Sequence, residues 1–185
     1  MKEQMNFSQN VGVQVSRRSG PSDSFNPKGT FEIEVICGKT GKVKHKETVH
    51  NVVANVGKNY ALDAAFRPAT SQLTWYIGLV DNSGWTAFAA GDTMSSHAGW
   101  AEFTSYDESA RQAWGPSAAA SQSISNSAAA SFTVNGSGTL KGIFVTSDNT
   151  ISGTAGTLWA GTAFSTTIPV SSSDVINVTY TVSAS

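Results

Sequence analysis

The stretch TFEIEVI, residues 30–36, alternates apolar and polar side chains along its whole length. In an extended chain its apolar residues would lie on one face and its two glutamates on the other. That alternation predicts a half-buried β-strand. The glycine-containing segment 38–42 predicts a turn, and residues 43–49 return the chain. Residues 30–50 are therefore expected to form a β-hairpin with an exposed edge.

One helix is predicted downstream of this hairpin. Residues 56–66, VGKNYALDAAF, place Leu62 and Phe66 four positions apart, as on one face of a helix. Asn55 is a suitable N-cap, and Pro68 closes the segment because it cannot continue the helix.

The other apolar stretches are short and predict strands. They cover residues 73–80, 132–134, 140–145, 157–160 and 176–182. Asn135-Gly136 favours a hairpin turn, and a short helical turn is expected between Asp92 and Gly99. Many short strands joined by Gly/Ser-rich turns predict an all-β, jelly-roll-like sandwich of about eight strands with one short helix.

Residues 1–28 form a separate segment, which we call the arm, in front of a sandwich predicted over residues 29–185. The arm has glycine and proline but no clear apolar period, so we expect it to be extended and mobile in the free protein. We expect it to order on an acidic groove of a partner or of a neighbouring subunit, with its apolar residues on one face of an added strand. The residues expected to bind are Phe7, Val11, Val13, Val15, Arg17 and Arg18.

Charge is distributed unevenly along the chain. Ten of the 12 Lys and Arg residues lie in residues 1–67, whereas residues 112–185 carry only Lys141, Asp148 and Asp174 as charged residues. A surface with little charge suits packing against neighbours, because little charge must be desolvated. This division favours a protein that docks on or within an assembly over one that turns over a substrate.

Several partner classes are disfavoured by composition. The net charge is −1, and the basic cluster at Arg17 is only a pair, so no nucleic acid is expected. No apolar run approaches the roughly 20 residues that span a bilayer, so no membrane partner is expected. With Cys37 as its single cysteine and no apolar signal segment at its start, the chain is expected to be made and folded in a reducing cytoplasm.

Two groups of polar residues are candidate catalytic sites. Asp92, Ser95, Ser96 and His97 nominally supply a nucleophile, a base and an orienting group, but no nucleophile-elbow pattern surrounds either serine. An Asp cap and a packed or solvated histidine explain them equally well.

The second group is the neighbouring acids Asp107 and Glu108. On a strand they would point to opposite faces, whereas glycoside hydrolysis needs two carboxyls that face one sugar. Pairing of Glu102 with Asp107 or Asp81 in space stays open. Three histidines and one cysteine give no metal-ligand spacing. We therefore expect no catalytic residue, no metal and no cofactor.

The five tryptophans are the remaining residues that could form a functional surface. Core packing, an oligomer interface and a carbohydrate platform would all use such rings. The residues expected at a possible oligomer interface are Trp85, Trp100, Trp114 and Trp159.

Four blocks of sequence, in this order, carry a resemblance to a known family. They are HNVVANVGKNYALDAAF (50–66), WYIGLVD (75–81), AAGDTMSSHAGWAEF (89–103), and the closing GIFVTSDNTISGTAGTLWAGTAF with DVINVTYTVS. From about residue 30 to the end, the chain resembles a family of structural virion proteins of tailed bacteriophages. The arm lies outside the resemblance.

The resemblance implies a non-enzymatic particle protein. The expected role is a capsid decoration, or cement, protein that binds the major capsid protein on the capsid exterior and stabilises the head. A homotrimer would suit the local threefold positions of the shell. The alternative is a head-fibre or tail-tip module that binds glycans without hydrolysing them; a tail-tube or head–tail joining subunit is a weaker third possibility.

Overall fold

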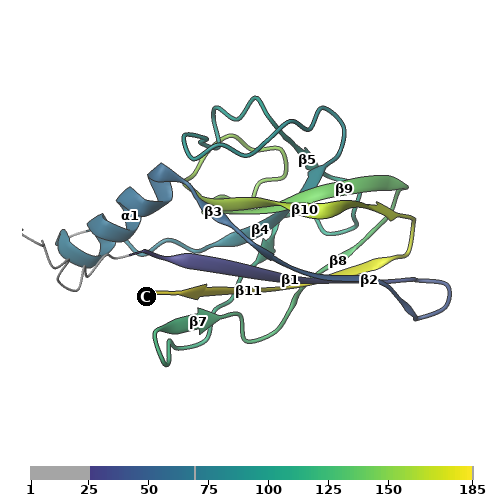
Figure 1. The fold of residues 1–185 in the computed structure, drawn as a ribbon, viewed down its shortest axis with the longest axis horizontal. Helices are drawn as coiled ribbons and strands as arrows, with labels where there is room; N and C mark the ends of the chain where they lie inside the picture. Colours follow the sequence, from purple (N-terminus) through teal and green to yellow (C-terminus); the bar gives the residue numbers. More distant parts are fainter. Residues whose placement is uncertain (1–25, 69, 185) are drawn as a thin grey trace, which may run out of the picture.

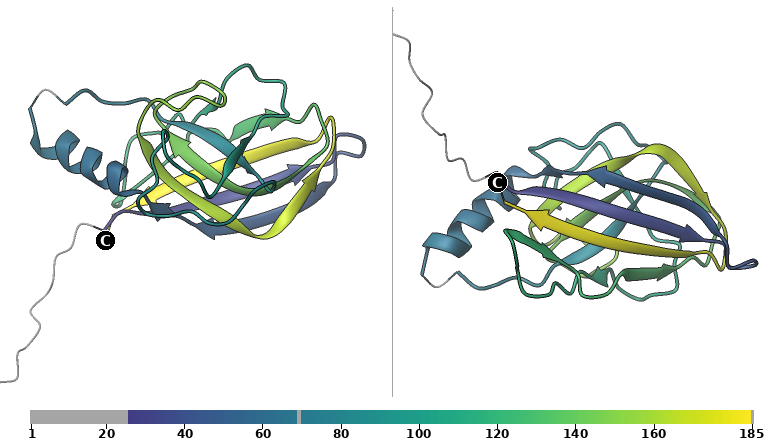
Figure 2. Two further views of the ribbon diagram at one scale, coloured as in Figure 1. Left: turned by 90° about the horizontal axis from the view of Figure 1, so that it is seen from above. Right: turned by 60° about the horizontal axis from the view of Figure 1, so that its bottom comes forward.

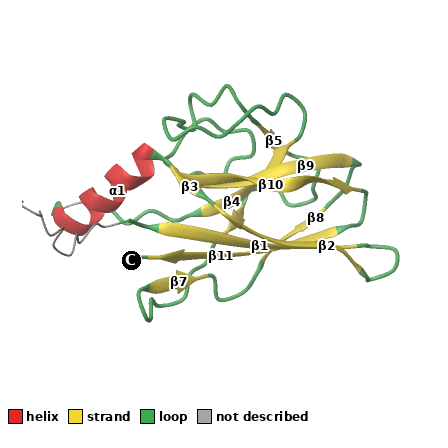
Figure 3. Cartoon of the chain, in the orientation of Figure 1, coloured by secondary structure: helices red, strands yellow, loops and turns green. Residues whose placement is uncertain are grey.

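The computed structural model describes residues 26–68 and 70–184, which form two antiparallel β-sheets and one α-helix (Figure 1). Figure 3 shows the two layers of strands, with the helix at one end and long loops beside the second sheet. The expected all-β sandwich with one helix is confirmed, because two antiparallel sheets pack together. The jelly-roll strand order stays a prediction.

The first sheet is built around two long central strands. Its order is β2-β1-β11-β7, and β8 also pairs with β11. The strands are β1 (Lys28–Ile36), β2 (Val43–His50), β7 (Ser123–Ser125), β8 (Ala130–Thr133) and β11 (Val175–Ser183). The predicted hairpin is confirmed as β1 and β2, and alternate residues of β1 are buried as its sequence pattern predicted.

The second sheet has the order β3-β10-β9-β4-β5, and β6 also pairs with β4. Its strands are β3 (Val52–Val53), β4 (Tyr76–Asp81), β5 (Ala101–Phe103), β6 (Gln112–Ala113), β9 (Gly138–Thr146) and β10 (Leu158–Val170). The chain passes from the first sheet to the second at Asn51, between β2 and β3. Two bonds tie β2 to β10 here: Thr162 Oγ1 donates to His50 O (2.8 Å), and Ser165 N donates to Glu47 Oε1 (2.7 Å).

The core fills the space between the sheets. Its largest buried side chains include Phe31, Phe103, Phe132, Phe164, Leu140 and Tyr180. A second, smaller apolar cluster is formed by Ala54, Val80, Met94, Trp100, Phe144 and Leu158, with Trp85 and Phe88 packed against it. The two clusters together contain most of the aromatic residues in the described part of the chain.

Helix α1 (Asn55–Phe66) lies at one end of the sandwich, and the β1–β2 turn lies at the other (Figures 1 and 2). The predicted helix is confirmed, but its cap is not. Asn55 is already helical, and the N-cap is Ala54, which makes no side-chain capping bond. Leu62 and Phe66 are 47% and 80% exposed, so this apolar pair faces solvent.

Two local predictions were wrong. Asn135-Gly136 does not close a hairpin, because β8 pairs with β11 in the first sheet and β9 pairs with β10 and β4 in the second. The chain therefore changes sheet at this turn. The segment after Asp92 is not helical; it forms a turn in which Thr93 and Ser96 bridge through their backbones.

Candidate functional site: an aromatic pocket beside the helix

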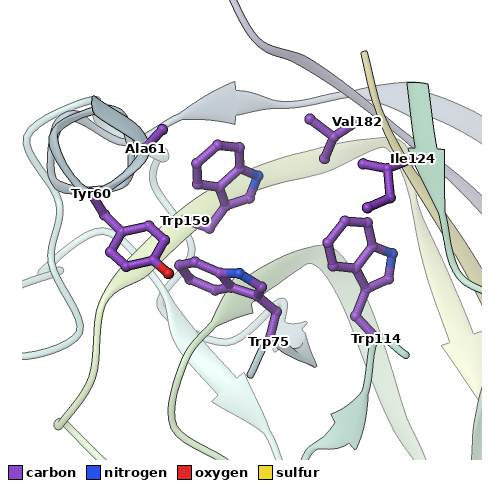
Figure 4. Close-up of a pocket in the computed structure, with 7 residues that line it drawn as sticks. All are labelled: Tyr60, Ala61, Trp75, Trp114, Ile124, Trp159 and Val182. Carbon is purple, nitrogen blue, oxygen red and sulfur yellow. The ribbon is translucent and has the colours of Figure 1, made fainter. Parts of the chain in front are cut away.

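An open apolar pocket lies between α1 and the adjoining ends of both sheets (Figure 4). Its volume is about 190 Å³. It is lined by Tyr60, Ala61, Trp75, Trp114, Ile124, Trp159 and Val182. We call it the aromatic pocket. No charged side chain lines it, so its chemistry is that of an apolar docking site.

Close approach of α1 to β10 forms one side of the pocket. Gly57 faces β10, and a Cβ at this position would lie 2.6 Å from the backbone oxygen of Trp159. A larger residue could not sit there without moving the helix. One turn later, Tyr60 and Ala61 reach the pocket wall (Figure 4). A glycine at this position therefore places the helix against the sheet.

Three aromatic rings form a continuous wall. The Tyr60 ring lies edge-on to Trp75 with centroids 5.3 Å apart, and Trp75 lies 5.7 Å from Trp159. Tyr60 Oη accepts a hydrogen bond from Leu73 N (2.9 Å) and donates to Ser71 O (3.3 Å). The Tyr60 hydroxyl thereby fixes the loop after α1, and with it the position of Trp75.

Tyr180, which is 0% exposed, holds the other two indoles. Trp159 Nε1 donates to Tyr180 Oη (2.7 Å), and Trp114 Nε1 donates to the Tyr180 backbone oxygen (2.8 Å). Asn51 Nδ2 also donates to Tyr180 Oη (2.9 Å). Burial raises the pKa of the Tyr180 hydroxyl above its ordinary value, more than the bonds from Trp159 and Asn51 lower it. The N–H groups of Trp114 and Trp159 are thus bonded inside the protein, and their carbon faces line the pocket.

A second groove continues from the aromatic pocket. The two share Ile124, Trp159 and Val182. The groove leads past the end of β11 to Pro27, the second residue that the structure describes, and Pro27 is buried. The aromatic pocket is therefore connected to the place where the arm joins the body.

The tryptophans expected at an oligomer interface fall into two groups. Trp114 and Trp159 lie in the aromatic pocket, whereas Trp85 and Trp100 belong to the smaller apolar cluster. Trp100 is 4% exposed and Trp114 is 6% exposed, so both rings pack within their own chain and offer little surface to a second subunit. Trp85 and Trp159 are partly exposed, and their place at an interface stays a prediction.

The residues predicted to bind through the arm lie outside the described part of the chain. They are Phe7, Val11, Val13, Val15, Arg17 and Arg18.

Glu102, a candidate catalytic carboxylate in the sequence, forms a buried ion pair with Arg111. Arg111 is 2% exposed and donates to both Glu102 oxygens at 2.8 Å and 2.9 Å. The same guanidinium donates to the backbone oxygens of Asp148 (2.9 Å) and Gly153 (3.0 Å). Two of the four bonds join the segment before β6 to β5, and the other two join it to the loop after β9, so this connection is structural.

Three other candidate catalytic residues, Asp92, His97 and Glu108, also make contacts within the fold. Asp92 Oδ2 accepts hydrogen bonds from Ala89 N (2.9 Å) and Trp100 Nε1 (3.0 Å). The His97 ring stacks on Trp100 with centroids 3.9 Å apart. Both Glu108 oxygens lie 3.0 Å from Thr133 N, which donates to this carboxylate.

Sequence reasoning missed most of the aromatic pocket. Tyr60, Ala61, Trp75 and Ile124 carried no prediction of a site, and they come from elements far apart along the chain. The only local signal was the strong apolar character of residues 73–80, which was interpreted as a strand. Trp75 instead precedes β4, which begins at Tyr76.

Comparison with protein-family models finds no match for this chain, and comparison with curated proteins finds no relative. Within residues 26–68 and 70–184, no cluster of three or more His, Cys, Asp or Glu residues could hold a metal ion. The one helix of this part of the chain is too short to cross a bilayer.

Proposed function

We propose that this protein is a structural component of a tailed-bacteriophage virion, and specifically a decoration protein on the capsid exterior that binds the major capsid protein. The observation that carries the proposal is the position of two prospective contact regions at opposite ends of one rigid sandwich. The resemblance of residues 30–185 to phage structural proteins supplies the identity of the assembly.

The first contact region is the tip of the β1–β2 hairpin, residues 37–42. Lys39 and Lys42 are exposed there, whereas Lys44 pairs with the buried carboxylate of Asp174. The tip therefore presents positive charge that is not matched by an ion pair within the described residues. Such a tip suits an acidic site on a neighbouring protein.

The second contact region is the helix end. Leu62 and Phe66 expose apolar surface there, and β1, which follows the arm, starts at the same end of the body (Figure 2). Strand β1 runs between the two ends (Figure 2). Its nine residues span about 30 Å at the usual rise per residue. A body of this length can contact two capsid subunits and hold them together.

A decoration protein stabilises the shell because its contacts are repeated over many copies. Each copy binds only the assembled shell, and so each binding event favours the assembled state. Many weak contacts repeated by symmetry oppose expansion and rupture of the head. High affinity at any one site is unnecessary.

The proposal includes no catalysis. It is supported by the structural hydrogen bonds of Asp92, Glu102 and Glu108 described above. Cleavage of a polysaccharide by the purified protein, lost on alanine substitution of Asp92, His97, Asp107 or Glu108, would contradict this part.

The alternative is a head-fibre or tail-tip module that binds glycans. The partly exposed faces of Trp75 and Trp159 favour it, because sugars stack on aromatic rings. Glycan sites also need polar groups that converge on the sugar hydroxyls. The inward hydrogen bonds of Trp114 and Trp159 leave the aromatic pocket poor in such groups.

Copy number separates the two functions. A decoration protein is present in hundreds of copies per purified particle, whereas a tail or vertex appendage is present in a few. Quantitative mass spectrometry of purified particles, with the major capsid protein as the internal standard, gives this ratio. A copy number typical of a single vertex would overturn the decoration role.

Binding to the shell tests the hairpin tip directly. The double variant Lys39→Glu, Lys42→Glu should bind particles that lack the protein more weakly than the wild type, with most of the change in association rate. Lys46→Glu, at an exposed position within β2 and away from both contact regions, is the matched control for charge reversal. Equal binding by the double variant and the wild type would remove the hairpin tip from the interface.

A further inference from the structure

We propose that the aromatic pocket is the docking site for the arm of the same chain in the free protein, with the Phe7 ring in the pocket and Val11, Val13 and Val15 along the adjoining groove. This inference does not depend on the virion role.

The size and chemistry of the pocket fit one aromatic side chain. A closed apolar cavity of about 150 Å³ binds benzene, so a ring fits a volume of about 190 Å³. The walls are the faces and edges of Tyr60, Trp75 and Trp159, which pack well against another ring. The pocket is therefore suited to a phenylalanine and unsuited to a charged group.

The groove leads from the pocket to the arm. Pro27 lines the groove, and 25 residues precede Asn26. An extended chain covers about 3.3 Å per residue, so the 19 steps from Phe7 to Asn26 reach well beyond this end of the body. The valines at positions 11, 13 and 15 share one strand face and can follow the groove while Arg17 and Arg18 remain in water.

Because the arm and the aromatic pocket belong to one chain, the chain's own arm is favoured over the arm of a second copy. A tethered segment of this length has an effective concentration in the millimolar range, above the micromolar concentration of a dilute protein solution. The entropy of closing the loop increases only slowly with loop length. The pocket of the arm's own body is thus filled first.

The proposal differs from the expectation that the arm is mobile in the free protein and orders only on an acidic groove of a partner or of a neighbouring subunit. Neither the aromatic pocket nor the adjoining groove of the chain's own body is lined by a carboxylate. Docking through apolar contacts should therefore change little between low and high salt, because screening acts on charge.

Limited trypsin digestion of the full chain tests the proposal. Arg17 and Arg18 lie between the docked valines and the body, and docking should slow cleavage after Arg18. Phe7→Ala should increase the rate of this cleavage about ten-fold, the change that corresponds to the loss of one buried apolar side chain. Phe66→Ala, which removes the same kind of ring from the exposed side of α1, is the matched control and should leave the rate unchanged.

A second variant enlarges a side chain that lines the pocket. Ala61→Phe places a ring where Phe7 is expected and should also expose the arm to trypsin. Acrylamide quenching of tryptophan emission should increase in Phe7→Ala, since three of the five tryptophans line the pocket.

Two results would overturn the proposal. One is cleavage of Phe7→Ala and Ala61→Phe at the wild-type rate. The other is protection of the wild type that disappears on dilution from about 100 µM to about 1 µM, which would show that the arm of a second copy fills the pocket. Protection that is independent of concentration and lost in both variants supports docking within one chain.

Discussion

At the scale of single residues, Arg111 and Glu102 form a bidentate ion pair whose side chains are only 1% and 6% exposed. Removing one partner of a buried pair leaves an uncompensated charge and typically costs 3–5 kcal/mol, so Glu102→Gln should lower the free energy of unfolding by about that amount. Urea denaturation at pH 7 measures the change. Glu32→Gln, at an exposed position of β1, is the control and should change stability by less than about 0.5 kcal/mol. Equal midpoints for the two variants would contradict a structural role for the pair.

A second residue-scale prediction concerns Asp174, which is 3% exposed. Burial alone would raise the pKa of its carboxyl, but hydrogen bonds from Lys44 Nζ and from the backbone N–H groups of Ser171 and Gly38 outweigh burial and lower the pKa below its ordinary value. The folded state therefore holds the proton less tightly than the unfolded chain.

The sign of the pH effect follows from this direction. The stability that Asp174 contributes is fully present above the pKa of an unfolded aspartate, about 3.9, and is lost as the pH falls through the lower folded value. Asp174→Asn should be less stable than the wild type at pH 6, and the difference should shrink below about pH 4. Melting temperatures of both proteins across this range provide the measurement. A difference that stays constant down to pH 2.5 would contradict it.

At the scale of elements, Gly57 determines how α1 meets β10. Alanine normally stabilises a helix by about 1 kcal/mol over glycine. Here the added Cβ would meet the Trp159 backbone oxygen, so Gly57→Ala should destabilise the protein and alter the tryptophan emission spectrum. Asn59→Ala, at an exposed position of the same helix, should instead be neutral or slightly stabilising. Thermal unfolding followed by fluorescence measures both, and a stabilised Gly57→Ala would show that the helix is not held against β10.

Elements with their own periodicity were predictable from sequence. The alternation in residues 30–36 predicted β1. The four-residue spacing of Leu62 and Phe66, followed by Pro68, predicted α1, although this apolar pair faces solvent. The turn at Asn135-Gly136 was misassigned because a turn dipeptide shows that the chain bends there, not which sheet the next strand joins. The aromatic pocket was unpredictable for a related reason: its walls come from six elements or their flanks and meet only when both sheets have packed. Residues such as Tyr60 and Trp75 give no local signal of their distant partners.

At the scale of the whole molecule, we predict a homotrimer. The low charge of residues 112–185 and the neighbouring exposed side chains of Leu62 and Phe66 on α1 favour association, since apolar patches on a protein surface often mark interfaces. Sedimentation velocity over a range of concentrations should show a trimer, weakened by Leu62→Ser with Phe66→Ser if the helix end takes part. A monomer at every concentration would contradict it.

Docking of the arm in the aromatic pocket and binding of the arm to a capsid would exclude each other. If the protein binds a capsid through the arm, as the sequence predicts, and if the aromatic pocket holds the arm in the free protein, the capsid must compete for the same side chains. The apparent affinity for the shell is then reduced by the fraction of molecules whose arm is free. Phe7→Ala would raise that fraction while also removing a capsid contact, so Ala61→Phe, which leaves the arm intact, is the cleaner variant for measuring the competition.

The pairing of β1 with β11 has a mechanical consequence. Lys28 lies opposite Ser183, so the first and last strands begin and end beside each other. Tension between these two chain ends would open the hydrogen bonds one after another, because ladder bonds run across the strands and the outermost pair would carry the whole load. Tension between the start of β1 and the hairpin tip is different, because β1 is already extended between these two points and its covalent backbone carries the load. A shell that swells under internal pressure would pull on the protein in this second, stronger direction if its subunits grip the arm end and the hairpin tip.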